Sequence, residues 1–325
     1  MLLPEKAYES LREARILMPK LFPNNQNIPF GISGAEDLTF IGFTVPSKGQ
    51  GAIKYYFRPS NKALGNLLSS QECDENIKKI LKAAEEFGIK PFEFSVNTTS
   101  GTPEAWRLLW TIPSSIRVDN SRMEILIRSL LGLMHMPKLS KTVLQTANCV
   151  QNSLKSRLNP LYLFGGHLNK QGIIEKVKLD FDTDIGEGNV IYNNTNSIKS
   201  FSALLQLFPS FDFSSVMDGK QYIAKFANSG FDICLLGMNM DAEGLTNLKI
   251  YLRKNEFPSE SECNFLEKVM DEYGCKLPYP LYSISEYFKS KGWGYSCFYI
   301  GISRDSIKTI KHYFCRNENG TCISG

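Results

Sequence analysis

The sequence lacks any long uninterrupted hydrophobic run. No stretch of about 18 apolar residues occurs in the chain, which argues against a membrane-spanning helix. The N-terminal stretch MLLPEKAYES reaches Glu5 and Lys6 before an apolar run long enough for a secretory signal can form. We therefore expect a cytoplasmic protein without membrane contact.

Histidine is scarce, and the cysteines show no metal-binding spacing. The three histidines, His135, His167 and His312, are far apart and belong to no HExxH motif, and the eight cysteines contain no CxxC pair. These absences argue against zinc chemistry. Scattered cysteines of this kind are typical of reduced packing residues in a cytosolic protein rather than of a disulfide framework.

The chain also lacks runs of one charge. Lys and Arg total 37 against 33 Asp and Glu, a net charge of +4, and the cations are spread along the sequence. This distribution gives no support for a nucleic-acid partner or an anionic membrane surface. With 325 residues, the chain is long enough to form one large barrel domain.

What the sequence does contain is strict alternation of apolar and polar residues. In NLKIYLRK, Leu248, Ile250 and Leu252 alternate with polar residues that include Lys249 and Tyr251. A period of two predicts a β-strand with two unlike faces. Similar stretches recur in four other places, which suggests that the polar faces share one interior instead of each facing water.

These stretches form five predicted hairpins, separated by helical patterns. An N-terminal helix is expected within residues 1–25, and the repeated ββαα units span about 37–90, 91–158, 160–229, 230–291 and 292–316. Such a repeated unit cannot bury its own apolar face, so closure or stacking is expected. We predict a single α+β domain over 1–325. Its ten antiparallel strands would form a closed barrel with a solvent-shielded lumen, ringed by outer helices that contact the apolar strand faces.

Each hairpin places a cation at a comparable point of its inward face. The five cations are Lys54, Arg107, Lys178, Lys249 and Lys311. In three hairpins a tyrosine follows two residues later, namely Tyr56, Tyr251 and Tyr313. A ring of cations and phenols would suit an anion with many oxygens, such as a diphosphate. The alternative is that these side chains belong to solvated strand faces.

Carboxylates of the predicted strands offer two further possibilities. Glu93 alternates with Phe92 and Phe94 and should point inward, either as a general base or as an ion-pair partner of Arg107. The stretch LDFDTD at 179–184 carries three aspartates that could bind Mg²⁺, or could simply lead from a strand end into a polar loop.

The five repeats, the strand motif NLKIYL, the strand IKYYFRP and the hairpin PFEFSVN…AWRLLWTIP together resemble the soluble aromatic prenyltransferases of the ABBA, or PT-barrel, fold. The resemblance covers nearly the whole chain in architecture. It implies that Glu93 is the catalytic base and that Arg107 binds diphosphate. Asn247 replaces the arginine of the family's Arg-x-Lys-x-Tyr strand, and Asp180 stands where a tyrosine is expected after Lys178. The sequence contains no DDxxD motif.

The resemblance implies an enzyme that transfers a dimethylallyl or geranyl group from its diphosphate to an indole-like or phenolic small molecule in natural-product biosynthesis. The five cations would bind the diphosphate, and Tyr56, Tyr251 and Tyr313 would shield the allylic cation. No cofactor is expected, since Lys54 occupies the place of a magnesium-binding aspartate in some bacterial members. The alternatives are prenylation of a peptide Tyr or Trp, a non-catalytic ligand-binding barrel, or an unrelated α+β fold. The oligomeric state is not predicted.

Overall fold

The structure is a computed structural model of the chain. It describes residues 35–46, 52–59, 75–98, 103–168, 173–183, 194–208, 226, 228–254, 256–277, 280–290, 292–303 and 306–315. The predicted N-terminal helix, the helical pattern at 61–68, most of that at 215–228 and the C-terminal tail lie outside the described residues.

The alternating stretches form antiparallel hairpins. The described residues contain ten strands: β1 (Ala35–Pro46), β2 (Ala52–Pro59), β3 (Pro91–Thr98), β4 (Pro103–Thr111), β5 (Leu161–Leu168), β6 (Ile174–Asp182), β7 (Asp232–Asp241), β8 (Gly244–Arg253), β9 (Gly294–Ser303) and β10 (Ser306–Cys315). Each odd-numbered strand pairs with the strand that follows it. The predicted α+β protein with a curled antiparallel sheet is confirmed.

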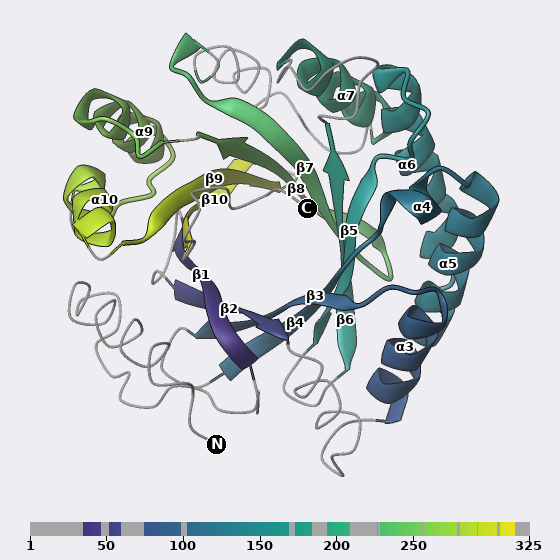
Figure 1. The fold of residues 1–325 in the computed structure, drawn as a ribbon. Coiled ribbons are helices and arrows are strands. Elements are labelled where there is room, and N and C mark those ends of the chain that lie inside the picture. The colour runs from purple at the N-terminus through teal and green to yellow at the C-terminus, as the bar shows by residue number, and fades with distance from the viewer. Residues whose placement is uncertain are drawn as a thin grey trace.

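The described strands close into a ring in the order β1-β10-β9-β8-β7-β6-β5-β4-β3-β2. The first and last strands meet in the antiparallel register Phe40↔Cys315 to Pro46↔Thr309. Each strand of the ring therefore has two hydrogen-bonded neighbours, so no strand presents an open edge. Figure 1 looks into this ring, with the described helices on its outside.

The helices lie between hairpins in the sequence. They are α3 (Glu75–Glu86), α4 (Ser114–Arg117), α5 (Asn120–Leu133), α6 (Leu139–Leu154), α7 (Asn194–Leu207), α9 (Glu260–Glu272) and α10 (Leu281–Ser290). A capping box between Ser259 and Glu262 begins α9, and Gly88, at φ +74°, follows the end of α3. In the described part of the chain, no helix combines the length and the apolar character needed to cross a membrane.

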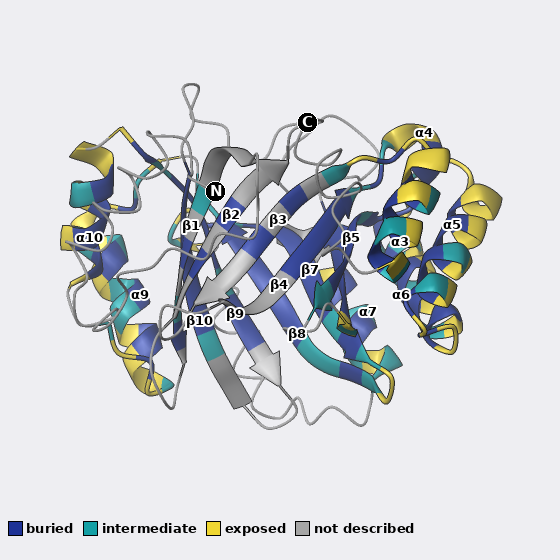
Figure 2. Ribbon diagram, turned by 90° about the horizontal axis from the view of Figure 1, so that it is seen from below, coloured by how far each residue is buried: buried dark blue, intermediate teal, exposed yellow. Residues whose placement is uncertain are grey.

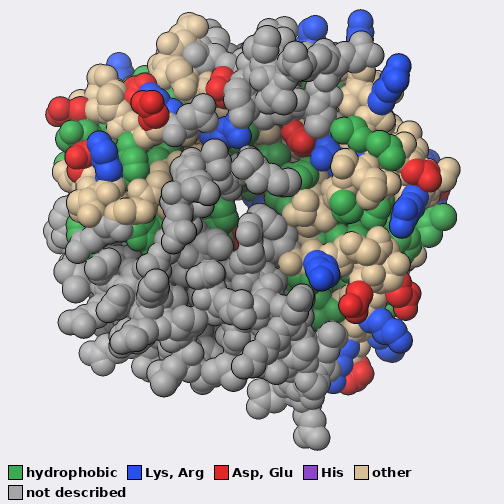
Figure 3. All heavy atoms as spheres, in the orientation of Figure 1, with side chains coloured by type: hydrophobic (Ala, Val, Ile, Leu, Met, Phe, Trp, Pro, Cys, Tyr) green, Lys and Arg blue, Asp and Glu red, His purple; other side chains and the backbone are tan. Residues whose placement is uncertain are grey.

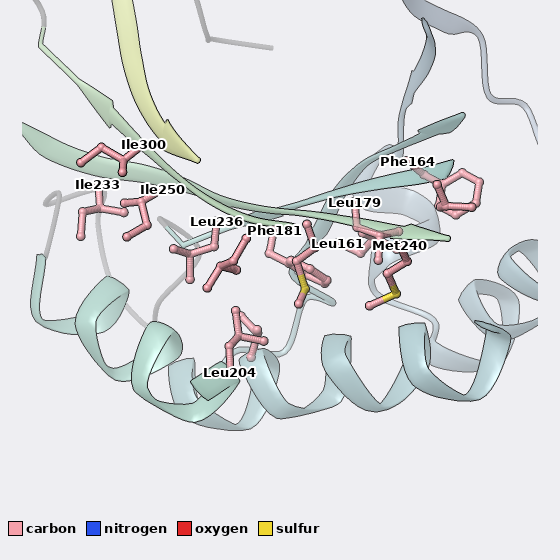
Figure 4. Close-up of a cluster of buried hydrophobic side chains, with 14 of the residues drawn as sticks. Leu161, Phe164, Leu179, Phe181, Leu204, Ile233, Leu236, Met240, Ile250 and Ile300 are labelled. Carbon is pink, nitrogen blue, oxygen red and sulfur yellow. The ribbon is translucent and has the colours of Figure 1, made fainter. Parts of the chain in front are cut away.

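The outer face of the ring is apolar, as the alternation predicts. Val177, Leu179 and Phe181 of β6 are fully buried in one large hydrophobic cluster that also contains helix residues. In Figure 4, Leu179 and Phe181 lie between the strands and the helix that carries Leu204. Each such buried side chain contributes roughly 1.5–3 kcal/mol to stability. Figure 2 shows the complementary pattern, with exposed residues on the outer sides of the helices.

The number of described helices that follow a hairpin differs from one hairpin to the next. Three helices, α4 to α6, follow β4, whereas two, α9 and α10, follow β8. The described residues contain one helix each after β2 and β6.

One sequence expectation about the cysteines is wrong. Cys315, at the end of β10, is disulfide-bonded, whereas Cys149, Cys234, Cys263, Cys275 and Cys297 are free thiols. The sequence contains no CxxC pair, so the spacing of the cysteines gave no indication of a disulfide.

Candidate functional site

The five predicted cations all point to the inside of the ring. Lys54 (β2), Arg107 (β4), Lys178 (β6), Lys249 (β8) and Lys311 (β10) each lie on the second strand of a hairpin, and none is more than 7% exposed. Their sequence neighbours face outward into the large hydrophobic cluster, for example Val177 and Leu179 around Lys178. We call these five residues the cation ring.

The members of the cation ring are close enough to repel one another. Burial lowers the pKa of Lys54 well below its usual value, and the charges of Arg107 and Lys311 lower it further. Burial likewise lowers the pKa of Lys249 and Lys311 well below the usual value, and Arg107 adds to both shifts. Such crowding of buried like charges is costly unless an anion compensates it.

Glycines of the neighbouring strands make room for the long cationic side chains. The antiparallel register places Lys54 opposite Gly42, Lys178 opposite Gly165, and Lys249 opposite both Gly237 and Gly301. A methyl group at these positions would collide with inner side chains or with backbone. A Cβ at Gly42 would lie 2.5 Å from Cε of Lys311. At Gly42 and Gly237 the missing side chain thus leaves space for inward side chains, among them Lys311 and Lys249 respectively.

Protein groups neutralise only part of this charge. Two carboxylates, Glu93 and Asp180, are buried beside the five cations, so the formal charges of these groups leave an excess of three positive charges in this layer. Asp180 forms an ion pair with Lys178 at 2.5 Å, and Nζ of Lys249 donates to Oδ1 of Asn239 at 2.8 Å. Among the described residues, neither Lys54 nor Lys311 has a carboxylate within ion-pair distance.

Tyrosines adjoin the cation ring on the same inner face. The predicted Tyr56, Tyr251 and Tyr313 belong to one small buried cluster, separate from the outer hydrophobic cluster. The hydroxyls of Tyr56 and Tyr313 are 3.1 Å apart and hydrogen-bonded. Nζ of Lys311 lies 5.2 Å from the ring centroid of Tyr56 and 5.4 Å from that of Tyr313. The aromatic faces are therefore positioned beside positive charge.

A fourth tyrosine, Tyr299 of β9, packs against this group, and it was not predicted from the sequence. Its ring centroid lies 5.3 Å from that of Tyr251 and 5.9 Å from that of Tyr313, and Nζ of Lys249 lies 5.8 Å from its ring. No cation precedes Tyr299 by two residues, so the Lys-x-Tyr pattern could not find it. Its alternation with the outward residues Phe298 and Ile300 was the available signal.

Glu93 of β3 lies on the inner face, as predicted, and is buried. Burial raises its pKa, although the positive charges of Lys178, Arg107 and Lys54 act in the opposite direction. Among the described ion pairs there is none between Glu93 and Arg107, since the register places Arg107 opposite Ser95 instead. A carboxylate with a raised pKa on an inner wall has the properties of a general base.

Several inward polar atoms find no hydrogen-bond partner in the described part of the protein. Two of them belong to donor groups, Nε of Arg107 and the hydroxyl of Tyr251, whereas Oε1 of Glu93 and Oδ1 of Asp180 are acceptors. Buried polar groups are normally paired with protein or ordered water, so unpaired ones at a single site are places where water or a ligand would bind. The inner face offers both donors and acceptors to such molecules.

His167 of β5 also lies beside the cation ring, although its position in the sequence gave no such indication. It is paired with Arg107 across the two strands. Burial and the neighbouring charges of Arg107, Lys54 and Lys249 lower its pKa well below the usual value. We expect it to be neutral at physiological pH.

The aspartate run at 179–184 is divided between separate contacts. Asp180 pairs with Lys178, and Asp182 pairs with Arg117 of α4 at 3.4 Å, while Asp184 lies outside the described residues. Within the described ranges, no three His, Cys, Asp or Glu side chains are grouped to hold a metal ion.

Seen along the same direction as Figure 1, the molecular surface has an opening near its middle. Hydrophobic side chains and a few charged ones lie on the described part of its rim (Figure 3).

Comparison with known proteins identifies the fold. No protein-family model matches the chain, and no curated protein sequence matches it. Among solved structures, the chain is similar to 6-dimethylallyltryptophan synthase from Micromonospora olivasterospora in complex with DMASPP and Trp, with 11% identity, a TM-score of 0.52, and coverage of 94% of this chain and 91% of that one.

Two further solved structures are similar to the chain over most of its length. AnaPT from Neosartorya fischeri is 11% identical, with a TM-score of 0.52 and coverage of 92% of this chain and 82% of that one. A second 6-dimethylallyl tryptophan synthase is 10% identical, with a TM-score of 0.54 and coverage of 96% and 92%. The resemblance to PT-barrel prenyltransferases is thus confirmed for the fold, across nearly the whole chain.

Proposed function

We propose that the protein is an aromatic prenyltransferase that transfers a dimethylallyl or geranyl group from its diphosphate to an indole-like or phenolic small molecule. The observation that carries the proposal is the buried cation ring, with its formal excess of three positive charges, next to the inward Tyr56, Tyr251, Tyr313 and Tyr299. A prenyl diphosphate carries about three negative charges near neutral pH and many acceptor oxygens. The similar synthase whose structure contains DMASPP and Trp supports the same substrate classes.

In the proposed reaction, the diphosphate binds among Lys54, Arg107, Lys178, Lys249 and Lys311. The C–O bond between the allylic carbon and the diphosphate breaks, and its electron pair leaves with the diphosphate. The cation ring stabilises the charge that develops on this leaving group, and this is the step at which fixed charges lower the barrier most.

The tyrosines would protect the resulting allylic cation. Tyr56, Tyr251 and Tyr313, joined by Tyr299, offer π faces that favour positive charge. A carbon of the acceptor ring attacks the cation, and Glu93 accepts the proton that the ring then loses. Closure of the lumen against water is part of the proposal, because water would otherwise capture the cation.

In this proposal the whole chain, 1–325, forms one barrel domain built from five ββαα units with outer helices. The enzyme needs no cofactor, because lysine and arginine side chains would neutralise the diphosphate without a metal. We place the protein in the cytoplasm, where free thiols such as Cys234 and Cys297 are typical, although Cys315 is disulfide-bonded.

The test is a pyrophosphate-release assay on the purified protein with dimethylallyl and geranyl diphosphate. Indoles and phenols are added singly, in EDTA and in Mg²⁺. We expect acceptor-dependent release in both conditions, and a loss of about 100-fold in kcat/KM for Lys249→Met. Lys176→Met is the matched control, because Lys176 is exposed near the end of β6.

The outcomes separate the alternatives. Binding of prenyl diphosphate without turnover of any small molecule would favour a peptide acceptor or a non-catalytic barrel, and Tyr- and Trp-containing peptides would then be tried. If wild-type protein binds no prenyl diphosphate, the prenyltransferase proposal is wrong.

A further inference from the structure

Asp180 is the exception to the Lys-x-Tyr pattern of the inner wall. Strands β2, β8 and β10 carry Lys followed two residues later by Tyr, whereas β6 carries Lys178 followed by Asp180. Asp180 is 1% exposed and faces inward, since Leu179 and Phe181 on either side belong to the outer cluster. A carboxylate thus occupies the layer that tyrosines fill elsewhere.

The two carboxylate oxygens of Asp180 have different surroundings. Oδ2 lies 2.5 Å from Nζ of Lys178, which accounts for one oxygen. Oδ1 lies over Gly237, where a Cβ would come within 2.5 Å of it, and no described residue donates a hydrogen bond to it. The adjacent Tyr251 contacts the same glycine position, and its hydroxyl also has no described partner.

The chemistry of the two proposed substrates decides which one can satisfy Oδ1. A prenyl diphosphate consists of a hydrocarbon chain and ionised phosphate oxygens, so it offers no hydrogen-bond donor to a carboxylate. The aromatic acceptor is the substrate that can carry an O–H or N–H group. Glu93, on β3, presents a second unpaired acceptor atom, Oε1.

We propose that Asp180 binds an O–H or N–H group of the aromatic acceptor, distinct from the group that faces Glu93. This inference rests on the proposed prenyltransferase function and deepens it by specifying the acceptor. The substrate class is an aromatic ring system with two separate hydrogen-bond donors, such as a hydroxyindole or a dihydroxylated aromatic. Asp180 then determines acceptor specificity.

The test compares hydroxyindoles with the corresponding methoxyindoles, substituted at each position of the benzene ring. A hydroxyl can donate to Asp180, and a methoxy group of the same position cannot. Both acceptor binding, measured by calorimetry in the presence of a non-reactive prenyl diphosphate analogue, and kcat/KM are determined. The proteins are wild type, Asp180→Asn, and Asp182→Asn as the control, since Asp182 pairs with Arg117.

For at least one ring position we expect wild type to prefer the hydroxyl over the methoxy compound by roughly tenfold or more. Asp180→Asn should reduce this ratio at least about tenfold, because the amide can donate to a methoxy oxygen. The analogue should bind Asp180→Asn as tightly as wild type or more tightly, since a negative charge near the diphosphate is removed. Asp182→Asn should leave the ratio unchanged.

Two results would overturn the inference. One is an active Asp180→Asn enzyme whose hydroxyl-to-methoxy ratio equals that of wild type. The other is an equal loss for all acceptors together with weaker analogue binding, which would reduce Asp180 to a positioning residue for Lys178. If the proposed prenyltransferase function itself is wrong, the result is different: wild type will neither bind the analogue nor turn over any acceptor.

Discussion

Replacing Gly42 by alanine should displace Lys311 from the cation ring and weaken diphosphate binding, without unfolding the barrel. The added Cβ would lie 2.5 Å from Cε and 3.3 Å from Nζ of Lys311, and 3.1 Å from Cε2 of Tyr56. These atoms belong to the far parts of side chains, so Lys311 can move aside instead of forcing the strands apart. The ammonium group would then leave the place where it lies between Tyr56 and Tyr313.

The size of the effect follows from the lost contact. A hydrogen bond between an ammonium group and a phosphate oxygen contributes about 1.5–3 kcal/mol, which corresponds to roughly 10- to 100-fold in affinity. We therefore expect binding of inorganic diphosphate to Gly42→Ala to weaken by about that factor. Calorimetry at low salt measures it directly, and thermal unfolding should change by only a few degrees.

Two other glycines of the sheet provide the controls. Gly166 points outward, and the atoms nearest to a Cβ there belong to the side chain of Ile174, at 3.3 Å, so Gly166→Ala should bind diphosphate normally. At Gly165 a Cβ would collide with the backbone carbonyl of Leu108, so Gly165→Ala should be unstable, by about 3 kcal/mol or more. If Gly42→Ala is folded and binds diphosphate as well as wild type, the reasoning about the glycines is wrong.

Two further predictions concern protons. Because burial and mutual repulsion lower the pKa values of Lys54, Lys249 and Lys311, bound diphosphate should raise them again, so binding should take up protons and weaken as pH rises. Calorimetry in two buffers of different ionisation enthalpy measures the uptake, and identical enthalpies would contradict it. Burial also lowers the pKa of His312 from 6.5 to about 3, so the unfolded chain binds a proton that the folded protein does not, and stability should fall as pH decreases from about 6.5 toward 3. Urea unfolding of wild type and His312→Gln should differ in slope by about 1.4 kcal/mol per pH unit in that range, and parallel curves would disprove the assignment.

The sequence by itself determined which face of each strand points inward, because the period of two is kept wherever a strand separates an apolar from a polar environment. Leu248, Ile250 and Leu252 face the outer cluster while Lys249 and Tyr251 are buried on the inner side, as their alternation predicts. All five predicted cations and all three predicted tyrosines lie together for the same reason. Side-chain direction along a strand is a local property, so it can be read from the sequence.

Only the tertiary structure decided which residues meet across the ring. Strand register places Tyr299 opposite Tyr251 and His167 opposite Arg107, and neither residue carries the motif that revealed the others. The pairing of Gly42, Gly165 and Gly237 with lysines depends on the register within three hairpins, whose turns differ in length.

The same limit applies to Asp180 and Glu93. Their side chains could be placed on the inner face from alternation, but sequence could not show that Asp180 pairs with Lys178 or that Glu93 does not pair with Arg107. Such choices depend on distances of a few ångströms set by closure of the whole ring. Local sequence patterns determine which side chains of a strand face inward, whereas closure of the barrel determines which of these side chains contact one another.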